Sequence, residues 1–227
     1  MAIIIQIETA TQVCSAAISE NGKTIALKEE AASNIHASSL TIFIKEAMDV
    51  AGLQFADVDA IAVSKGPGSY TGLRIGVSTA KGLCFALDKP LIAIETLQMM
   101  AAGFLIEQPD FSGLICPMID ARRMEVFTAV YDRQLKEVIP VTAKIIDQHS
   151  FAEVLEVSSV KFLGDGAEKC KVALDHKNAM FSKSNFNSAG NMSKLSYEAF
   201  TASNFVDVAY FEPFYLKDFV LTIPKKR

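Results

Sequence analysis

The chain has 227 residues, of which half are hydrophobic and 21% are charged, and its formal net charge is −4. This length is enough to bury one large core or two small ones. The acidic balance argues against strong, direct binding to a nucleic-acid backbone, which favours basic surfaces.

The first half of the chain is expected to open with a β-hairpin and then to alternate helices and strands. The Asn21-Gly22 dipeptide stands between two strand-like runs and is typical of a tight hairpin turn. Leu40, Ile44 and Met48 recur at four-residue spacing, which predicts a helix that Gly52 ends. The other expected elements are strands at 2–8, at 58–68 (running into a glycine turn) and at 89–96, and helices at 70–87 and 97–107.

The second half repeats this order after a break at 109–113, which is rich in turn-forming residues. Residues 113–145 predict three strands joined by turns. The elements expected after them are a helix around 150–157, a strand at 160–167, a helix from Ala167 and a helix near 192–203.

Because each half places hairpins before alternating strands and helices, we predict an α/β fold with two mixed sheets flanked by helices. The predicted division is an N-terminal domain at 1–108 and a smaller C-terminal domain at 109–227. It stays open whether the last helix packs back onto the first domain.

The sequence also predicts a soluble, cytoplasmic protein. No hydrophobic run has the length needed to span a bilayer, and no secretory signal opens the chain. The cysteines form no C-x-x-C pair, and most lie in hydrophobic runs, so we expect buried, reduced thiols at Cys14, Cys84, Cys116 and Cys170.

Two polar turns are candidate phosphate sites. The first hairpin brings Glu8, Thr9 and Thr11 to a tip whose backbone N–H groups could hold phosphate and its metal ion. The alternative is an ordinary hairpin with a hydrogen-bonded threonine turn. The second turn, Gly164-Asp165-Gly166, follows a strand at a position where α/β proteins often bind ligands, although it can equally be a bare turn.

A third candidate is the glycine turn before the helix at 70–87. Gly66 and Gly68 precede a helix N-terminus, an arrangement that can bind anions through free N–H groups and the helix dipole. The spacing, however, matches neither the Walker loop nor the dinucleotide-binding fingerprint.

The helix at 70–87 carries small residues at four-residue intervals. Gly72, Gly76 and Ala80 form one smooth face, and glycine inside a helix is unfavourable by about 1 kcal/mol relative to alanine. Such a face would allow another helix to approach closely. Two interpretations remain open here: contact with another subunit, and close packing within the same chain.

Several segments spread along nearly the whole chain resemble the TsaB (YeaZ) family. They are GPGSYTGLRIGVSTAKGL, IIIQIETATQVCSAAI, MIDARRMEVFTAVYD, FLGDGA and the closing FEPFYLKDFV. The resemblance implies two ribonuclease-H-like halves of the actin-like ATPase superfamily. It also implies work with a TsaD-like catalytic subunit and a TsaE-like ATPase. Together these transfer threonylcarbamoyl from threonylcarbamoyl-adenylate to N6 of the tRNA adenosine next to the anticodon, giving N6-threonylcarbamoyladenosine (t6A).

The resemblance further implies that this chain is not itself an enzyme. TsaD-like proteins carry a metal-binding H-x-x-x-H after an equivalent helix and strand, and the pattern falls here on Thr96 and Met100. These side chains cannot replace two imidazoles. A pseudo-enzyme scaffold without catalytic or metal-ligating residues is therefore expected. The alternatives are a glycoprotease-like metallopeptidase and a sugar-kinase-like phosphotransferase.

The scaffold is expected to form a homodimer alone and to pair with the TsaD-like subunit in the working complex, contacting tRNA only indirectly and no membrane. The expected interface residues are Tyr70, Gly72, Leu73, Arg74, Gly76, Thr79 and Ala80.

The candidate phosphate residues are Glu8, Thr9, Thr11, Gly66, Gly68, Gly164, Asp165 and Gly166. Glu8 stands where relatives commonly carry aspartate, so we expect weak or no binding of ATP or ADP and assign no cofactor. Lys217 stands where the family usually has arginine, which matters only for a bidentate contact.

Overall fold

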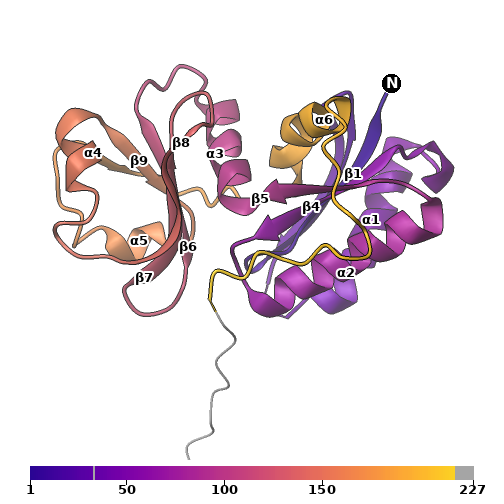
Figure 1. Cartoon of the computed structure of the whole chain (residues 1–227), viewed down its shortest axis with the longest axis horizontal. Coiled ribbons are helices and arrows are strands. Elements are labelled where there is room, and N and C mark those ends of the chain that lie inside the picture. Colours follow the sequence, from indigo (N-terminus) through magenta and orange to yellow (C-terminus); the bar gives the residue numbers. More distant parts are fainter. Residues whose placement is uncertain (33, 218–227) are drawn as a thin grey trace, which may run out of the picture.

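Two five-stranded sheets form the framework of the protein (Figure 1), described here from a computed structural model that covers residues 1–32 and 34–217. The N-terminal sheet has the order β3-β2-β1-β4-β5, and the C-terminal sheet has the order β10-β9-β6-β7-β8. The strands are β1 (Ile3–Glu8), β2 (Val13–Glu20), β3 (Lys23–Ala31), β4 (Ala60–Gly66), β5 (Leu91–Glu95), β6 (Leu114–Asp120), β7 (Glu125–Tyr131), β8 (Glu137–Ile145), β9 (Val160–Leu163) and β10 (Ala179–Phe181).

The two sheets have the same topology, which confirms the predicted repeat of architecture. In the N-terminal sheet β1 pairs antiparallel with β2 and parallel with β4, so that Ile5 lies between Ile18 and Ile61. In the C-terminal sheet β6 likewise pairs antiparallel with β7 and parallel with β9. Each sheet therefore combines a three-stranded meander with two parallel strands. The predicted α/β class with two mixed sheets is confirmed.

The helices follow the expected order. They are α1 (His36–Ala51), α2 (Tyr70–Leu87), α3 (Thr96–Glu107), α4 (Ala152–Val157), α5 (Ala167–Cys170) and α6 (Ser193–Thr201), with short 3₁₀ turns η1 (Phe55–Asp57) and η2 (Ala189–Met192). The predicted hairpin turn is also present, with both Asn21 and Gly22 at positive φ, as a two-residue turn between twisted strands requires.

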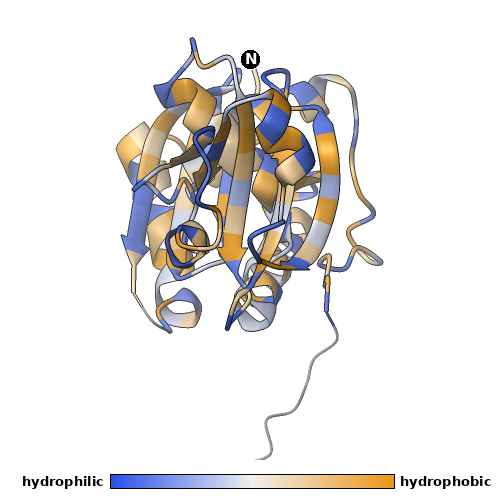
Figure 2. Ribbon diagram, turned by 90° about the vertical axis from the view of Figure 1, so that its left-hand side faces the viewer, coloured by the Kyte–Doolittle hydropathy of each residue, from blue (hydrophilic) through white to orange (hydrophobic). Residues whose placement is uncertain are grey.

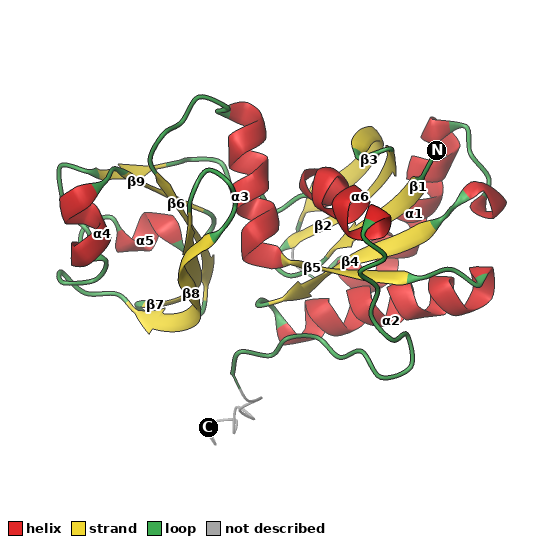
Figure 3. Cartoon of the chain, turned by 45° about the horizontal axis from the view of Figure 1, so that its top comes forward, coloured by secondary structure: helices red, strands yellow, loops and turns green. Residues whose placement is uncertain are grey.

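The N-terminal sheet is covered on both faces (Figure 3). On one face Ile3, Ile5 and Ile7 pack against α1 and α2, and on the other Ile4 packs in the cluster that contains α3, η2 and α6. Because successive strand residues point to opposite faces, a strand buried on both sides must be hydrophobic throughout. This explains the continuous isoleucine run of β1.

The helix α3 joins the two sheets. Most of its side chains are buried, and they share one hydrophobic cluster with Ile92 of the N-terminal sheet and with Ile115 and Leu163 of the C-terminal sheet. The opposite face of the C-terminal sheet packs against α4 and α5. Figure 2 shows hydrophobic and hydrophilic residues interspersed along the strands of this lobe. The predicted domain boundary at 108/109 falls just after α3, and the last helix, α6, lies on the N-terminal sheet.

The chain then returns along α2 as an extended segment, residues 204–217, which Figure 1 shows crossing toward the C-terminal lobe. Lys81 donates to the carbonyl of Ala209 at 3.0 Å, and the Phe214 N–H donates to the carbonyl of Lys65 at 2.7 Å. Lys217 forms an ion pair with Glu125 of β7. This segment therefore links the two lobes independently of α3. The remainder of the closing FEPFYLKDFV motif, residues 218–220, lies outside the described residues.

The cysteines, one short strand and the lengths of the helices complete the comparison between the sequence and the fold. The four cysteines are free and buried, as expected. The three-residue strand β10 was not predicted, because so short a segment shows no alternation that could be recognised. Within the described ranges, no helix combines the length and hydrophobicity needed to cross a membrane.

Candidate functional site

The glycine face of α2 packs inside the chain. A Cβ atom added at Gly72 would come closer than 3.0 Å to the carbonyl oxygen of Thr9, and one added at Gly76 would come equally close to the Thr9 hydroxyl. Real Cβ atoms essentially never make such contacts. The hairpin tip that follows β1 therefore requires glycine at both positions. The interpretation in which these glycines contact another subunit is wrong, and the close packing is intramolecular.

The helical phase explains this correction. Gly72, Gly76 and Ala80 form one buried stripe, and Leu73 and Val77 form a second one beside it. Neighbouring positions on a helix are separated by only about 100°, so the two stripes merge into one broad buried sector. Four of the predicted interface residues, Gly72, Leu73, Gly76 and Ala80, lie in this sector and are not available to a partner.

The remaining predicted interface residues lie at or near the surface. Arg74 is exposed, with its guanidinium 4.6 Å from the ring centroid of Tyr70, and Thr79 is half-buried. Tyr70 also stacks on Tyr215 of the returning segment at a centroid distance of 4.6 Å. This edge of α2 is therefore partly covered by the chain itself.

Of the outward side of α2, only Arg74 was among the predicted interface residues. This outward side consists of Thr71, Arg74, Ser78, Gly82 and Phe85, which we call the exposed α2 face. A Cβ at Gly82 would meet nothing within 4 Å, and the Phe85 side chain is 88% exposed. The signal available in the sequence was the i, i+3, i+4 spacing of these residues on the side opposite to Val77 and Ala80.

The glycine turn before α2 is also closed by the chain itself. A Cβ at Gly68 would overlap the carbonyl oxygen of Ala10, which already accepts a hydrogen bond from the Ser69 N–H at 2.7 Å. Gly66 approaches the backbone of Phe214 in the same way, and the Ser69 hydroxyl caps the Gly72 N–H at 3.3 Å. The close approaches that require glycine in this turn are thus to protein backbone rather than to a phosphate.

Glu8 is fully buried at the end of β1. One carboxyl oxygen accepts a hydrogen bond from the Ala10 N–H at 2.5 Å, while the other, Oε2, has no partner among the described residues. Burial raises the pKa of Glu8 to about 7, against the lowering effect of the Ala10 hydrogen bond. With a pKa near 7, this carboxyl is only partly ionised at neutral pH, which makes it a weaker ligand for Mg²⁺ than a fully ionised carboxylate. The enclosed position of Glu8 at the hairpin tip therefore fits a magnesium–nucleotide site poorly.

The other hairpin-tip residues are equally enclosed. The Thr9 hydroxyl is buried beside Gly76 and has no hydrogen-bond partner in the described part of the chain, and the Thr11 hydroxyl accepts from the Val13 N–H at 3.3 Å. The latter contact is the hydrogen-bonded threonine turn that the sequence analysis gave as the alternative to a phosphate site.

The turn at Gly164-Asp165-Gly166 lies against the end of β6. Cβ atoms at both glycines would come closer than 3.0 Å to neighbouring atoms, at Gly164 to the carbonyl oxygen of Met118. Asp165 accepts a hydrogen bond from the Asp120 N–H at 2.9 Å, and burial raises the pKa of its carboxyl. The Asp120 carboxylate in turn forms an ion pair with Lys169. The Lys169 ammonium thus already neutralises the Asp120 carboxylate, which a metal ion would need as a ligand.

The two positions that correspond to metal-binding histidines have structural roles in this chain. The Thr96 hydroxyl accepts a hydrogen bond from the Gly66 N–H at 3.1 Å, and Met100 is fully buried, with its methyl group next to Gly164. The start of α3 therefore connects the glycine turn of the N-terminal lobe to the glycine turn of the C-terminal lobe. In the described part of the chain, no cluster of three or more His, Cys, Asp or Glu side chains could hold a metal ion.

Comparison with known proteins agrees with this architecture. The family model described as "TsaD: tRNA N6-adenosine threonylcarbamoyltransferase" matches residues 25–224. The tRNA threonylcarbamoyladenosine biosynthesis protein TsaB of Escherichia coli is 34% identical over 130 residues, which are 57% of this chain and 55% of that protein. TsaB of Bacillus subtilis is 46% identical over 87 residues, which are 37% of this chain and 36% of that protein.

The solved structure of YeaZ from Pseudomonas aeruginosa superposes with a TM-score of 0.83 at 25% identity, covering 95% of this chain and all of that one. The chain belongs to the TsaB (YeaZ) family. The chain spans about half or less of the length of the curated relatives named above. Membership confirms the predicted family and accounts for the repeated sheets.

Proposed function

We propose that this chain is a non-catalytic partner subunit in t6A synthesis, which supports a TsaD-like transferase and a TsaE-like ATPase. The observation that carries the non-catalytic part is the use of Thr96 and Met100 for packing between the lobes, at the positions where a transferase would hold its metal. Neither side chain suits a hard or borderline metal ion. The same replacement argues against the metallopeptidase alternative.

The experiment that tests this proposal is reconstitution of tRNA modification. We expect that the TsaD-like and TsaE-like proteins, given tRNA and threonylcarbamoyl-adenylate, form little t6A until this chain is added. The chain without the TsaD-like protein should form none, because it lacks the metal site. The t6A content of the tRNA is measured by nucleoside mass spectrometry. Undiminished modification in the absence of this chain, or modification by this chain alone, would contradict the proposal.

The exposed α2 face is the surface that we assign to partner docking, both in a homodimer and in the complex with the TsaD-like protein. An aromatic side chain as exposed as Phe85 next to small residues is typical of an interface centre, since it can enter a partner's groove without obstruction. The face is not enclosed by the returning segment, in contrast to Tyr70.

Replacing Phe85 by glutamate is expected to weaken association at least tenfold, because interface aromatics commonly dominate binding energy. Stability should change by less than about 0.5 kcal/mol, since the side chain is on the surface. The matched control is Val172→Glu, which places the same charge on a side chain that is 91% exposed in the C-terminal lobe. Light scattering measures the association constant of the homodimer, and surface plasmon resonance measures that of the complex with the TsaD-like protein. Equal association constants for the two variants would contradict the assignment of this face.

Nucleotide is expected to bind weakly or not at all. Glu8 is buried and its pKa is raised to about 7, so its carboxyl is only partly ionised at neutral pH, and millimolar Mg–ATP should raise the melting temperature by less than about 1 °C relative to Mg²⁺ alone. Differential scanning fluorimetry makes the comparison. A concentration-dependent rise that disappears in Glu8→Gln would instead indicate a functional nucleotide site at the hairpin tip.

A further inference from the structure

Arg74 is the charged side chain of the exposed α2 face. The other members of this face, Thr71, Ser78, Gly82 and Phe85, carry no charge. The Arg74 side chain is exposed, and none of the ion pairs within residues 1–32 and 34–217 includes it. The chain therefore leaves this cation without a carboxylate of its own on the surface that we assign to partner docking.

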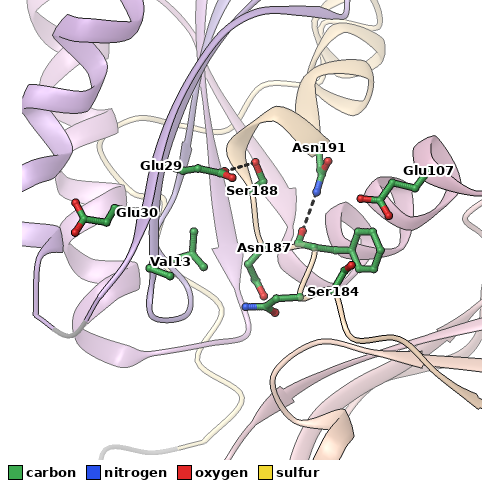
Figure 4. Close-up of a pocket in the computed structure, with 11 residues that line it drawn as sticks. Val13, Glu29, Glu30, Glu107, Ser184, Asn187, Ser188 and Asn191 are labelled. Carbon is green, nitrogen blue, oxygen red and sulfur yellow. Dashed lines mark hydrogen bonds between the residues drawn. The ribbon is translucent and has the colours of Figure 1, made fainter.

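Acidic side chains line a different part of the surface. Helix α2 contains Arg74 and Lys81 and no acidic residue, although the net charge of the chain is −4. The pocket between β3, the end of α3 and the loop before η2 is lined by Glu29, Glu30 and Glu107, by no lysine or arginine and by no residue of α2 (Figure 4). A partner that docks on α2 thus meets a positive potential on an otherwise acidic protein.

Two aromatic rings hold Arg74 in place. Its guanidinium carbon lies 4.6 Å from the centroid of the Tyr70 ring, and this ring stacks on Tyr215 with the centroids 4.6 Å apart and the planes inclined by 36°. A guanidinium over an aromatic face is stabilised by the charge distribution of the ring. The stack therefore restricts a long side chain before docking, which lowers the conformational entropy that docking must remove.

Tyr215 is itself fixed on both sides along the chain. The Phe214 N–H donates to the carbonyl of Lys65 at 2.7 Å, and Lys217 forms an ion pair with Glu125 of β7. The first contact lies in the N-terminal lobe and the second in the C-terminal lobe, so the returning segment spans both (Figure 1). The stack on α2 therefore depends on how this segment lies across the two lobes.

Local helix energetics do not account for Arg74. It lies in the second turn of α2, near the positive end of the helix dipole, where acidic side chains are more favourable than basic ones. The residues three and four positions away are Tyr70, Thr71, Val77 and Ser78, so no helical ion pair supports it either. Arginine is, by contrast, enriched at the energetic centres of protein interfaces.

We propose that Arg74 binds a carboxylate of the TsaD-like subunit and that Tyr215 is a positioning residue that acts through Tyr70. This inference rests on the docking face proposed above. A planar guanidinium can bind a carboxylate through two parallel hydrogen bonds. A second copy of this chain fits the cation less well, since an isologous contact places the same cationic helix on both sides. Arg74 thus favours the complex over the homodimer.

Surface plasmon resonance with the TsaD-like protein tests the cation. Arg74→Gln should weaken the complex about tenfold, as expected for loss of a charge-assisted hydrogen bond. It should leave the homodimer constant in light scattering unchanged or raised. Salt should weaken the native complex more steeply than that of Arg74→Gln. The control Lys177→Gln, at an exposed position of the C-terminal lobe, removes the same charge and should bind as the native chain does. Equal complex constants for the native chain and Arg74→Gln would overturn the proposal.

A double-mutant cycle tests the positioning role. Tyr215→Leu should weaken the complex about threefold because the stack is lost, whereas Tyr215→Phe keeps the ring and should bind as the native chain does. In the Arg74→Gln background Tyr215→Leu should have no further effect. An equal loss in both backgrounds would show that Tyr215 acts independently of Arg74, and the positioning role would be wrong.

Two comparisons separate this inference from the docking face itself. If Phe85→Glu weakens the complex and Arg74→Gln does not, the docking face stands and this inference fails. If neither variant weakens it, the docking face fails as well. The carboxylate could also come from a second copy, since Glu212 of the returning segment is exposed. Loss of the homodimer in both Arg74→Gln and Glu212→Gln, with an unchanged complex, would show this and contradict the proposal.

Discussion

Replacing Gly72 by alanine is expected to destabilise the chain by about 3 kcal/mol, although alanine is the better helix former. The added methyl group overlaps the backbone carbonyl of Thr9, and backbone cannot rotate away as a flexible side chain can. The matched control is Gly82→Ala on the same helix, where the methyl group meets nothing within 4 Å. That variant should be more stable than the native chain by up to about 1 kcal/mol. Urea unfolding followed by circular dichroism measures both changes.

A double-mutant cycle sharpens this prediction. The methyl group of Gly76→Ala collides with the Thr9 hydroxyl rather than with backbone, so a second change, Thr9→Ala, should restore much of the lost stability. The same second change should not rescue Gly72→Ala. Suppose that Gly72→Ala unfolded at the same urea midpoint as the native chain but no longer formed a homodimer in light scattering. The glycines would then belong to an interface between subunits after all.

The stability of the chain is expected to fall by about 3 kcal/mol between pH 5 and pH 8 through Glu8 alone. Burial raises the pKa of Glu8 in the folded chain from the ordinary 4.5 to about 7. Between these two values the folded chain holds a proton that the unfolded chain has released. Raising the pH therefore favours unfolding throughout this window, and the effect is complete once the pH exceeds the folded-state pKa.

Glu8→Gln isolates this effect, because glutamine keeps the shape of the protonated acid and does not titrate. The free energy of unfolding of the variant minus that of the native chain should rise by about 3 kcal/mol from pH 5 to pH 8. Urea denaturation at four or five pH values measures the difference. Glu156→Gln, an exposed position on α4, should follow the native curve. Parallel curves for Glu8→Gln and the native chain would show that Glu8 is ionised in the folded protein.

The two largest predicted effects concern one place, the contact between the hairpin tip after β1 and the start of α2. The space at this tip is filled by the chain itself through Thr9, Ala10 and Gly68. The two positions on α3 that match the metal-binding histidines of TsaD-like proteins are also used for packing. Thr96 accepts a hydrogen bond from the Gly66 N–H, and Met100 lies against Gly164. Both places are thus packed by the chain's own residues, which supports the proposed scaffold role.

Local signals predicted most of the elements. The Asn21-Gly22 turn, the helix at 70–87 and the first strand at 2–8 were all predicted close to their observed positions. Turn chemistry and helical periodicity depend on residues close together in the sequence, so a single sequence is enough to recognise them. The helix from Ala167 was also expected, but the structure limits it to four residues.

The sequence by itself determined the order of the elements, the repeated architecture and the family, because these follow from local patterns and from motifs spread along the chain. The tertiary structure alone decided which side of α2 is covered, and it alone showed that Glu8 is buried with no partner for its second oxygen among residues 1–32 and 34–217. The physical reason is that burial is set by residues distant in sequence. Glycine at position 72 allows close approach in any context, and only the fold shows that Thr9 is what approaches it.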